Sequence, residues 1–272
     1  MTKDLSELHA VSYLAPNWFG FYQSVTDALA RALSIDVQLR QGECDPLEDP
    51  LLLNDQLDLA FICGLPFIRH HQTNPHQLQV LAAPVMQAPR YGDRPIYFSD
   101  LIVNATSAIH QFPDLVGKIF GYNDPGSNSG YYLVRWHLLS QGYAEDFFGA
   151  WIATGFHQRS LQRLIDRQID AAAIDSTVLE QVLQDHPEWK QSVRVIETIG
   201  PSPMPPIVAA NHSSPAIIDK LRSTLLHPDQ TLQAAMAIAG VKRYAHQSWQ
   251  DYEVLAERYR MVTHDPRFTQ DY

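Results

Sequence analysis

The sequence predicts a two-lobed α/β protein, and three observations support this fold class. Short apolar runs typical of buried strands alternate with amphipathic stretches of helical period along the 272 residues. Hydrophobic residues make up 45% of the chain, enough to bury a substantial core and too many for a disordered chain. Two extended runs, near residues 97–103 and 194–206, interrupt the alternation. We interpret both as crossovers between lobes, although the Pro-rich second run could instead be a surface loop.

The first lobe is expected to comprise residues 1–98 together with 203–272. Its first helix, at 18–33, carries an apolar stripe through Phe21, Val25, Leu29 and Leu33. Residues 64–66 are expected to form a turn, because Gly and Pro flank Leu65 there. The strands expected in this lobe lie at 8–13, 35–39, 57–63, 79–83 and 207–210, and the remaining helices at 215–226, 229–239 and 249–261.

The second lobe is expected to comprise residues 99–202. Strand–helix–strand alternation predicts a mostly parallel sheet with helices on its faces, in this lobe as in the first. The helix expected at 176–184 ends before Pro187, which cannot continue it. The strands expected here lie at 118–122 and 169–174, and the other helices at 129–141 and 157–167.

Charge and composition exclude several classes of protein. The formal net charge of -10 argues against a nucleic-acid partner, which would require a basic face, but a local site can still bind an anion. No apolar run is long enough to span a membrane. The first residues show no secretory leader, so the sequence as written predicts a cytoplasmic protein, or a periplasmic one if a leader was removed before recording. Cys44 and Cys63 are expected to be free thiols, although a disulfide stays possible.

The segment from Asp124 to Gly130 (Asp-Pro-Gly-Ser-Asn-Ser-Gly) follows a predicted strand and precedes a predicted helix. Helix N-termini expose unpaired N–H groups and a partial positive charge, which suit an oxyanion. The hydroxyls of Ser127 and Ser129 and the amide of Asn128 add neutral donors, and Gly130 lets the backbone approach a ligand. The alternative is an ordinary capped helix, and the Gly-Lys-Ser/Thr ending of a Walker A loop is absent.

Four further residues are candidates for ligand contact. His157 precedes a second helix and could donate to an oxyanion, or could be a surface histidine. Asp175 ends an apolar strand, where it could accept from a protonated ligand or, the favoured interpretation, cap the next helix. Tyr97 and Tyr13 stand at strand ends, where packing is the alternative role.

No metal, cofactor or catalytic nucleophile is expected. His70, His71 and His76 lack metal-ligand spacing with a carboxylate or cysteine partner, so a solvated helix end is the favoured interpretation. The chain contains neither a Gly-x-Ser-x-Gly elbow nor a Cys-x-x-Cys pair.

Taken together, these residues resemble the phosphate, phosphite and phosphonate substrate-binding proteins of ABC transporters (PhnD-like). The resemblance covers nearly the whole chain and implies a type 2 periplasmic-binding-protein fold, with two crossover strands as a hinge and a ligand held between lobes. It also implies that phosphoryl oxygens contact Ser127, Asn128, Ser129 and His157, while Tyr97 and a first-lobe aromatic, for which Tyr13 is the candidate, close the site. The motifs that carry it are Phe112-x-Asp-Leu-x-Gly-Lys-x-Phe120, Ser127-x-Ser-Gly130, Gly155-x-His-x-x-Ser160, Ile169-Asp-Ala-Ala172, Leu57-Asp-Leu-Ala-Phe61 and Tyr97-x-Ser99.

Two departures from the family pattern narrow the expected ligand. Family members that bind aminophosphonates carry acidic residues where Thr177 stands and in the loop after the second crossover, which here reads Ser202-Pro-Met-Pro-Pro206. An amine would lack its carboxylate partners. The expected ligand is therefore phosphate, phosphite or a small alkylphosphonate.

The function expected from these residues is non-catalytic capture of a phosphorus oxyanion, as a transport receptor or a sensor. An ABC transporter permease is the expected partner, and the protein is expected to be a monomer. The main alternative is a cytoplasmic enzyme, because menaquinone-pathway and thiamine-pyrimidine enzymes share this architecture and fold alone does not settle function. A signalling partner that senses lobe closure is a third possibility.

Overall fold

The structure is a computed structural model that describes residues 7–268. The chain divides into two compact units: unit 1 comprises Met1–Ile96 and Pro203–Glu253, and unit 2 comprises Tyr97–Ser202 and Val254–Tyr272. It passes between them inside strand β5 (Ile96–Asn104), inside strand β9 (Val193–Pro203), and again at the start of helix α9 (Glu253–Thr263).

The third crossing corrects the expected boundaries, which assigned all of 203–272 to the first lobe. Residues 254–268 group with unit 2, and side chains among them pack on helix α4 (Leu133–Ser140) and the turn before it. Tyr259 meets Tyr132 with ring centroids 4.7 Å apart, and the Arg258 guanidinium lies 4.5 Å from the Trp136 ring centroid.

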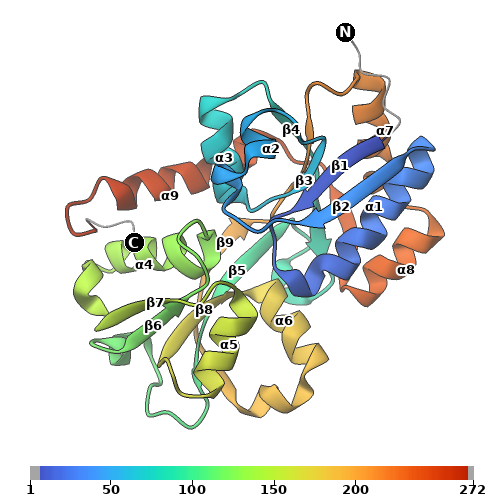
Figure 1. Cartoon of the computed structure of the whole chain (residues 1–272). Helices are drawn as coiled ribbons and strands as arrows, with labels where there is room; N and C mark the ends of the chain where they lie inside the picture. The colour runs from blue at the N-terminus through green and yellow to red at the C-terminus, as the bar shows by residue number, and fades with distance from the viewer. Residues whose placement is uncertain (1–6, 269–272) are drawn as a thin grey trace. The chain divides into compact units, whose positions relative to one another are not determined.

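Unit 1 contains a six-stranded sheet in the order β11-β4-β10-β3-β1-β2 (Figure 1). Strands β1 to β4 point the same way, since β1 pairs in parallel with β2 and β3, and β10 runs antiparallel to both β3 and β4. Strand β11 is also antiparallel to β4, so the sheet is mixed. The strands are β1 (Glu7–Ser12), β2 (Asp36–Gln41), β3 (Leu59–Phe61), β4 (Leu78–Met86), β10 (Ile207–Ala210) and β11 (Val241–Ala245).

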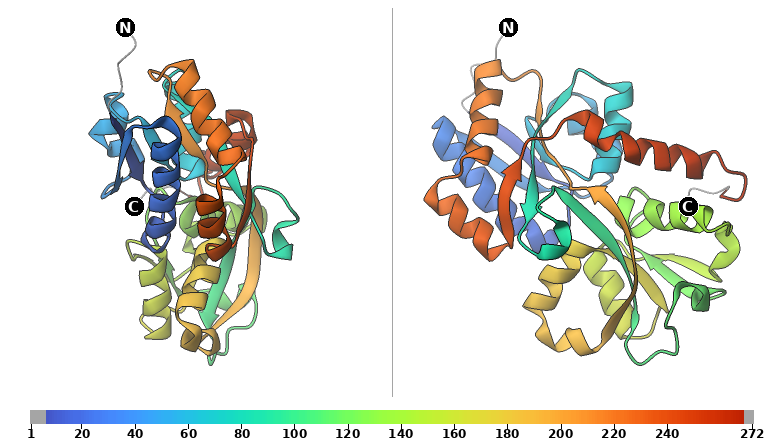
Figure 2. Two further views of the ribbon diagram at one scale, coloured as in Figure 1. Left: turned by 90° about the vertical axis from the view of Figure 1, so that its right-hand side faces the viewer. Right: turned by 180° about the vertical axis from the view of Figure 1, so that it is seen from behind.

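Helices cover this sheet, and α1 (Phe19–Leu33) lies beside α7 (Pro215–Leu226) and α8 (Gln230–Ile238), as Figure 2 shows. The predicted stripe of α1 is buried at Phe21, Val25 and Leu29. The expected turn at 64–66 is wrong, because helix α3 (Gly64–Thr73) begins there. Its Pro66 occupies the first helical turn, where a missing backbone N–H breaks no helical hydrogen bond. A short helix, α2 (Pro50–Leu53), precedes it.

Unit 2 contains a five-stranded sheet in the order β7-β6-β8-β5-β9. Strand β6 (Ile119–Tyr122) pairs in parallel with β7 (Ala150–Ala153) and β8 (Ala171–Asp175), whereas β5 is antiparallel to β8. The predicted α/β class is confirmed, with mixed sheets in place of mostly parallel ones. Its helices are α4, α5 (His157–Ile165), α6 (Ser176–Asp185) and the part of α9 beyond Glu253.

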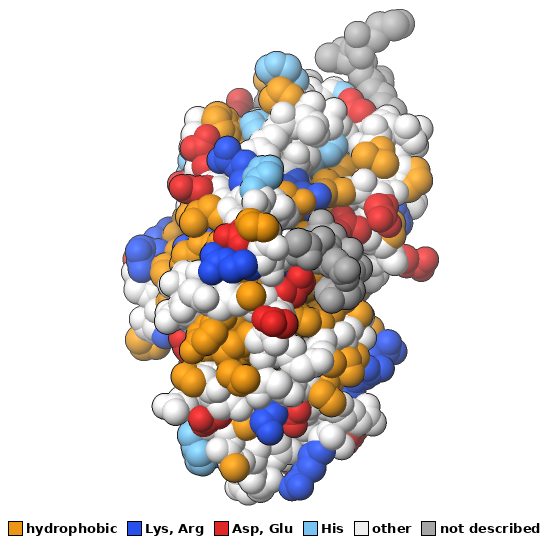
Figure 3. Space-filling view, turned by 90° about the vertical axis from the view of Figure 1, so that its left-hand side faces the viewer, with side chains coloured by type: hydrophobic (Ala, Val, Ile, Leu, Met, Phe, Trp, Pro, Cys, Tyr) orange, Lys and Arg blue, Asp and Glu red, His pale blue; other side chains and the backbone are white. Residues whose placement is uncertain are grey.

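Surface charge is mixed on the face drawn in Figure 3, where acidic and basic side chains lie interspersed. The net charge of -10 therefore does not form one acidic patch on that face. Among the described residues, no helix combines the length and apolar character needed to cross a membrane. Cys44 and Cys63 are not joined by a disulfide.

Candidate functional site: a neutral anion cradle in unit 2

The predicted oxyanion loop joins strand β6 to helix α4. A turn of π-helix, η5 (Asn128–Tyr132), precedes α4, and Ser127 caps it by accepting a hydrogen bond from the Gly130 N–H at 3.1 Å. Because this hydroxyl oxygen is the acceptor, its own proton stays available for donation. Ser127, Asn128 and Ser129 are each less than a tenth exposed. We call Ser127–Gly130 together with His157 the cradle.

His157 begins helix α5, and the chain just before it fixes its position. Gly155 adopts the left-handed region (φ +95°), which permits the reversal between β7 and α5. The hydroxyls of Thr154 and Ser160 hydrogen-bond at 2.6 Å beneath the turn. The starts of two helices are thereby brought together, and His157 Nε2 lies 3.0 Å from Ser129 Oγ.

The cradle carries no formal charge near neutral pH. Burial lowers the pKa of His157 to about 4, since desolvation penalises the imidazolium, so the imidazole is neutral. Its Nδ1 atom is buried without a hydrogen-bond partner in the part of the chain that the structure describes. The donors offered to an anion are therefore the Ser127 hydroxyl, backbone N–H groups and either the Ser129 hydroxyl or the imidazole N–H, since the Ser129–His157 contact occupies one of these two protons.

Gly130 lies so close to its neighbours that no side chain fits. A Cβ atom added there would lie 1.8 Å from Asn123 Oδ1 and 3.3 Å from His157 Cε1. The glycine is thus required by close approach, since its φ is not in the left-handed region.

Tyr97 and Asn128 form the buried side of the cradle. Asn128 Nδ2 donates to the Tyr97 hydroxyl at 2.6 Å and to Ser202 Oγ at 3.3 Å. These bonds engage both protons of the amide, so Asn128 can offer an anion its backbone N–H rather than its side chain. Ser99 fixes the next residue by donating to the carbonyl oxygen of Ser129 at 2.7 Å.

Asp175 caps helix α6, the role favoured from the sequence. Its Oδ1 accepts from the backbone N–H of Thr177 at 2.8 Å and from the Thr177 hydroxyl at 2.7 Å. Where strands β5 and β8 pair, Asp175 lies opposite Ser99, and Ser99 donates to the carbonyl oxygen of Ser129. Burial raises the pKa of Asp175 to about 6, and the hydrogen bonds from Thr177 oppose that rise.

Tyr13 is the one predicted ligand residue that belongs to unit 1. Its hydroxyl donates to Asp49 Oδ2 at 2.8 Å, and the same oxygen accepts from Arg40 at 2.7 Å. Burial and the Asp49 carboxylate raise the pKa of Tyr13. The phenol is thus committed to Asp49, while one face of its ring lies against Gly42, where an added Cβ would come within 2.5 Å.

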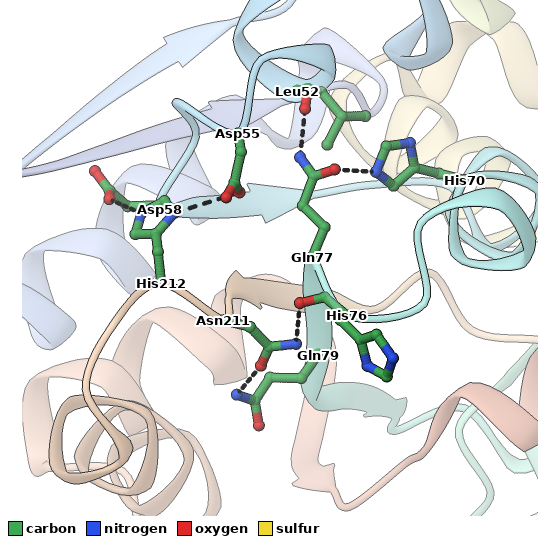
Figure 4. A network of polar contacts seen from close by, with 9 residues as sticks. All are labelled: Leu52, Asp55, Asp58, His70, His76, Gln77, Gln79, Asn211 and His212. Carbon is green, nitrogen blue, oxygen red and sulfur yellow. Dashed lines mark hydrogen bonds and ion pairs between the residues drawn. The ribbon is translucent and has the colours of Figure 1, made fainter. Parts of the chain in front are cut away.

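His70 and the backbone of His76 take part in a polar network of unit 1 (Figure 4). The expected solvated helix end is wrong for His70, which is buried and lies 2.9 Å from Gln77 Oε1 through Nε2. In the same view, His212 lies between Asp55 and Asp58, at 3.3 and 2.8 Å. Within residues 7–268, no group of three or more His, Cys, Asp or Glu side chains could hold a metal ion.

Sequence reasoning missed the residues that support the cradle from elsewhere in the chain. Asn123 had a weak signal, because it directly follows the β6 strand. Ser202 stood in the Pro-rich segment but was considered only as part of a shortened loop. Arg258 gave no signal, since its helix was assigned to the other lobe.

Two α/β units with mixed sheets flanked by helices, one of which carries the candidate cradle, are the architecture of type 2 periplasmic-binding proteins. Residues 18–252 match the family described as ABC transporter, phosphonate, periplasmic substrate-binding protein. The chain belongs to this family. It is also 27% identical over 143 residues to the phosphonates-binding periplasmic protein of Escherichia coli K12. That match spans 50% of this chain and 42% of the relative.

Solved structures with 16% sequence identity share the fold. A binding protein component of an ABC phosphonate transporter from Pseudomonas aeruginosa aligns with a TM-score of 0.81, over 94% of this chain and 86% of that one. PhnD1 from Prochlorococcus marinus, solved in complex with methylphosphonate, aligns with a TM-score of 0.82, over 94% of this chain and 98% of that one.

Proposed function

We propose that this protein captures a small phosphorus oxyanion without an amine, as a transport receptor or a sensor. The observation that carries the proposal is the cradle itself, in which the starts of two helices and several hydroxyls surround one buried position. Family membership supports the same ligand class, and the methylphosphonate complex of a structural neighbour makes a small alkylphosphonate the first ligand to test. The family also makes an ABC transporter permease the proposed partner.

The proposed binding mode assigns a donor to each phosphoryl oxygen. The Ser127 hydroxyl, the Tyr97 hydroxyl and the backbone N–H groups at the start of η5 donate to the ligand. The pair Ser129 and His157 adds one more donor, because one of their two protons lies in their mutual contact: the imidazole N–H when Ser129 donates to Nε2, or the Ser129 hydroxyl when Nε2 donates. Hydrogen bonds to a charged group are stronger than neutral ones, so this set can bind an anion without forming an ion pair.

The same residues disfavour an ammonium group on the ligand. Thr177 has no carboxylate, and its hydroxyl donates to Asp175. Asp175 already accepts two hydrogen bonds on Oδ1. The segment 202–206 contains no acidic residue. An amine would therefore lose its hydration without gaining an anionic partner.

Isothermal titration calorimetry tests this proposal on protein freed of bound ligand. The panel is methylphosphonate, phosphite, phosphate, 2-aminoethylphosphonate and methanesulfonate. We expect a phosphorus oxyanion without an amine to bind most tightly and to raise the melting temperature as its concentration exceeds Kd. Tighter binding of 2-aminoethylphosphonate than of methylphosphonate and phosphite would contradict the ligand class. The absence of heat and of any thermal shift with every phosphorus oxyanion would contradict capture itself.

The enzyme alternative has one specific observation in its favour, the 3.0 Å contact of Ser129 Oγ with His157 Nε2. This is the spacing of a nucleophile and its general base. A serine–histidine pair also needs a basic imidazole and a group that orients Nδ1. Here the pKa of His157 is lowered to about 4, and Nδ1 has no partner within residues 7–268, so we favour binding. Phosphorus NMR of each titrated ligand after prolonged incubation checks this choice, because turnover would produce a new resonance.

A further inference from the structure

A chain of hydrogen bonds leads from the cradle to the C-terminal helix within unit 2. Asn128 Nδ2 donates to Ser202 Oγ at 3.3 Å, and the Arg258 guanidinium donates to the same oxygen at 3.4 Å. Arg258 also donates to the carbonyl oxygen of Pro201 at 3.4 Å. A hydroxyl oxygen has two lone pairs, so Ser202 can accept from both side chains at once. Ser202 is 1% exposed, which leaves this bridge without competition from water.

Arg258 is held firmly enough to act through this bridge. It lies on α9 with its guanidinium 4.5 Å from the ring centroid of Trp136, a residue of α4. Stacking on an aromatic face and hydrogen bonding to Ser202 fix the planar group in two directions. The side chain is only partly exposed, so its charge is less screened than that of a surface arginine.

We propose that Arg258 is a positioning residue whose positive charge acts on the cradle without direct contact with the ligand. This charge makes the site prefer a dianion to a monoanion. Arg258 acts through the electric field of its own charge, while Ser202 holds the guanidinium close to Asn128. This inference rests on the proposed capture of a phosphorus oxyanion. It deepens that function because an alkylphosphonate exists in both charge states near neutral pH, whereas a sulfonate is always a monoanion.

The charge argument has a definite sign. A fixed positive charge stabilises a bound dianion about twice as much as a bound monoanion, so affinity should rise as the ligand loses its second proton. The ionisable groups that act on Arg258 are Tyr97 and Glu257, and the latter is exposed. Within the site, His157 and Asp175 titrate in every variant alike. Comparison between variants therefore isolates the contribution of Arg258.

The test measures methylphosphonate affinity at one pH below and one pH above the second ionisation of the ligand. Arg258→Gln removes the charge, whereas Arg258→Lys keeps it and loses the planar stacking. Arg260→Gln is the matched control, because Arg260 is an exposed residue of the same helix whose guanidinium donates to the carbonyl oxygen of Ala256 in that helix. Urea unfolding of each variant shows whether the fold is retained.

We expect Arg258→Gln to weaken binding about tenfold at the higher pH and distinctly less at the lower pH. Arg258→Lys should keep the wild-type ratio between the two pH values, and Arg260→Gln should match wild type. Equal losses at both pH values in Arg258→Gln would overturn the proposal, as would a loss of the same size in Arg260→Gln. If wild-type protein binds no methylphosphonate at either pH, the proposed function fails. If wild type binds and Arg258→Gln behaves identically, only the role of Arg258 fails.

Discussion

The imidazole of His157 and the hydroxyl of Ser129 lie 3.0 Å apart, although each belongs to the start of a different helix. Each helix start alone offers a few backbone donors and a partial positive charge. The contact holds the two starts against a common point, and Ser99 holds Ser129 from the strand side. This convergence, rather than either helix by itself, makes the cradle a candidate site for a tetrahedral anion.

Ser129→Ala and His157→Ala should each weaken methylphosphonate binding about tenfold to a hundredfold, since each removes a hydrogen bond to a charged ligand. The double variant should lose less than the product of the two, because both groups contact each other as well as the ligand. Calorimetry on all four proteins gives the coupling. Ser140→Ala, an exposed serine at the end of α4, is the control and should bind as wild type does. Independent losses in the double variant would show that the two residues do not act together.

Gly130→Ala should destabilise the protein and abolish ligand binding, because the new methyl group would overlap Asn123 Oδ1. Overpacking of this kind costs about 1 to 3 kcal/mol in the free energy of unfolding. Gly20→Ala is the matched control, since a Cβ at that position of α1 meets nothing within 4 Å. That change should stabilise the protein by up to about 1 kcal/mol, as alanine usually does in a helix. Urea unfolding of both variants decides the point.

A second change tests the cause of the Gly130 effect. Asn123→Ala removes the oxygen that the new methyl group would meet, so Asn123→Ala combined with Gly130→Ala should recover part of the lost stability. If the double variant loses as much free energy of unfolding as the two single variants lose together, the collision with Asn123 is not the cause.

Asp175→Asn should become more stabilising relative to wild type as pH rises. Burial raises the folded-state pKa of Asp175 to about 6, so between pH 4 and 6 the folded protein holds a proton that the unfolded chain has released. The wild type therefore loses stability over that window, by on the order of 2 to 3 kcal/mol, and asparagine does not. Asparagine also caps helices well, so the cap is retained. Urea unfolding at about pH 4 and about pH 7 measures the difference.

Asp229→Asn provides the control of opposite sign. Asp229 caps α8, and the hydrogen bond from the Leu232 N–H, with that from Arg31, lowers its pKa. Its contribution to stability is present above the unfolded pKa and is lost as pH falls. Asparagine at 229 should therefore be neutral or destabilising at pH 7. A parallel response of the two variants to pH would contradict the assigned burial of Asp175.

Tyr13→Phe should lower the free energy of unfolding by about 1 kcal/mol, because Asp49 loses one of its hydrogen bonds. Ligand affinity should change less than twofold, since the resemblance assigns Tyr13 an aromatic contact and its hydroxyl is engaged by Asp49. Tyr13→Ala removes the ring and should weaken binding. Loss of binding in Tyr13→Phe with unchanged stability would instead assign the hydroxyl to the ligand.

Elements with strong periodicity could be predicted from the sequence. The strand Ile207–Ala210 and the helix Pro215–Leu226 were expected with these bounds, and the apolar stripe of α1 is buried except at Leu33, which is half-buried. Weak local signals failed. Proline hid the start of α3. The strands β7 and β11 were missed, because β7 has only four residues and β11 is interrupted by the exposed Lys242 and Arg243.

Local pattern also located the cradle loop and the cap at Asp175, since both depend on where a strand ends and a helix begins. The partners of the cradle depend instead on packing between distant segments. Ser202 lies 74 residues from Asn128 along the chain, and Arg258 lies 56 residues further on. No periodicity or short motif encodes such pairs, so they become visible only in the folded chain.

The return of residues 254–268 to unit 2 has a consequence for biosynthesis. Tyr259 packs on Tyr132, and Arg258 packs on Trp136. The Arg135 guanidinium lies 5.4 Å from the ring centroid of Phe268. Helix α4 is therefore covered by residues that a ribosome makes later than all of unit 1. Domains generally fold as they emerge, N-terminal parts first. Residues 254–268 therefore reach helix α4 only after all of unit 1 has been synthesised, and until then α4 exposes this aromatic surface.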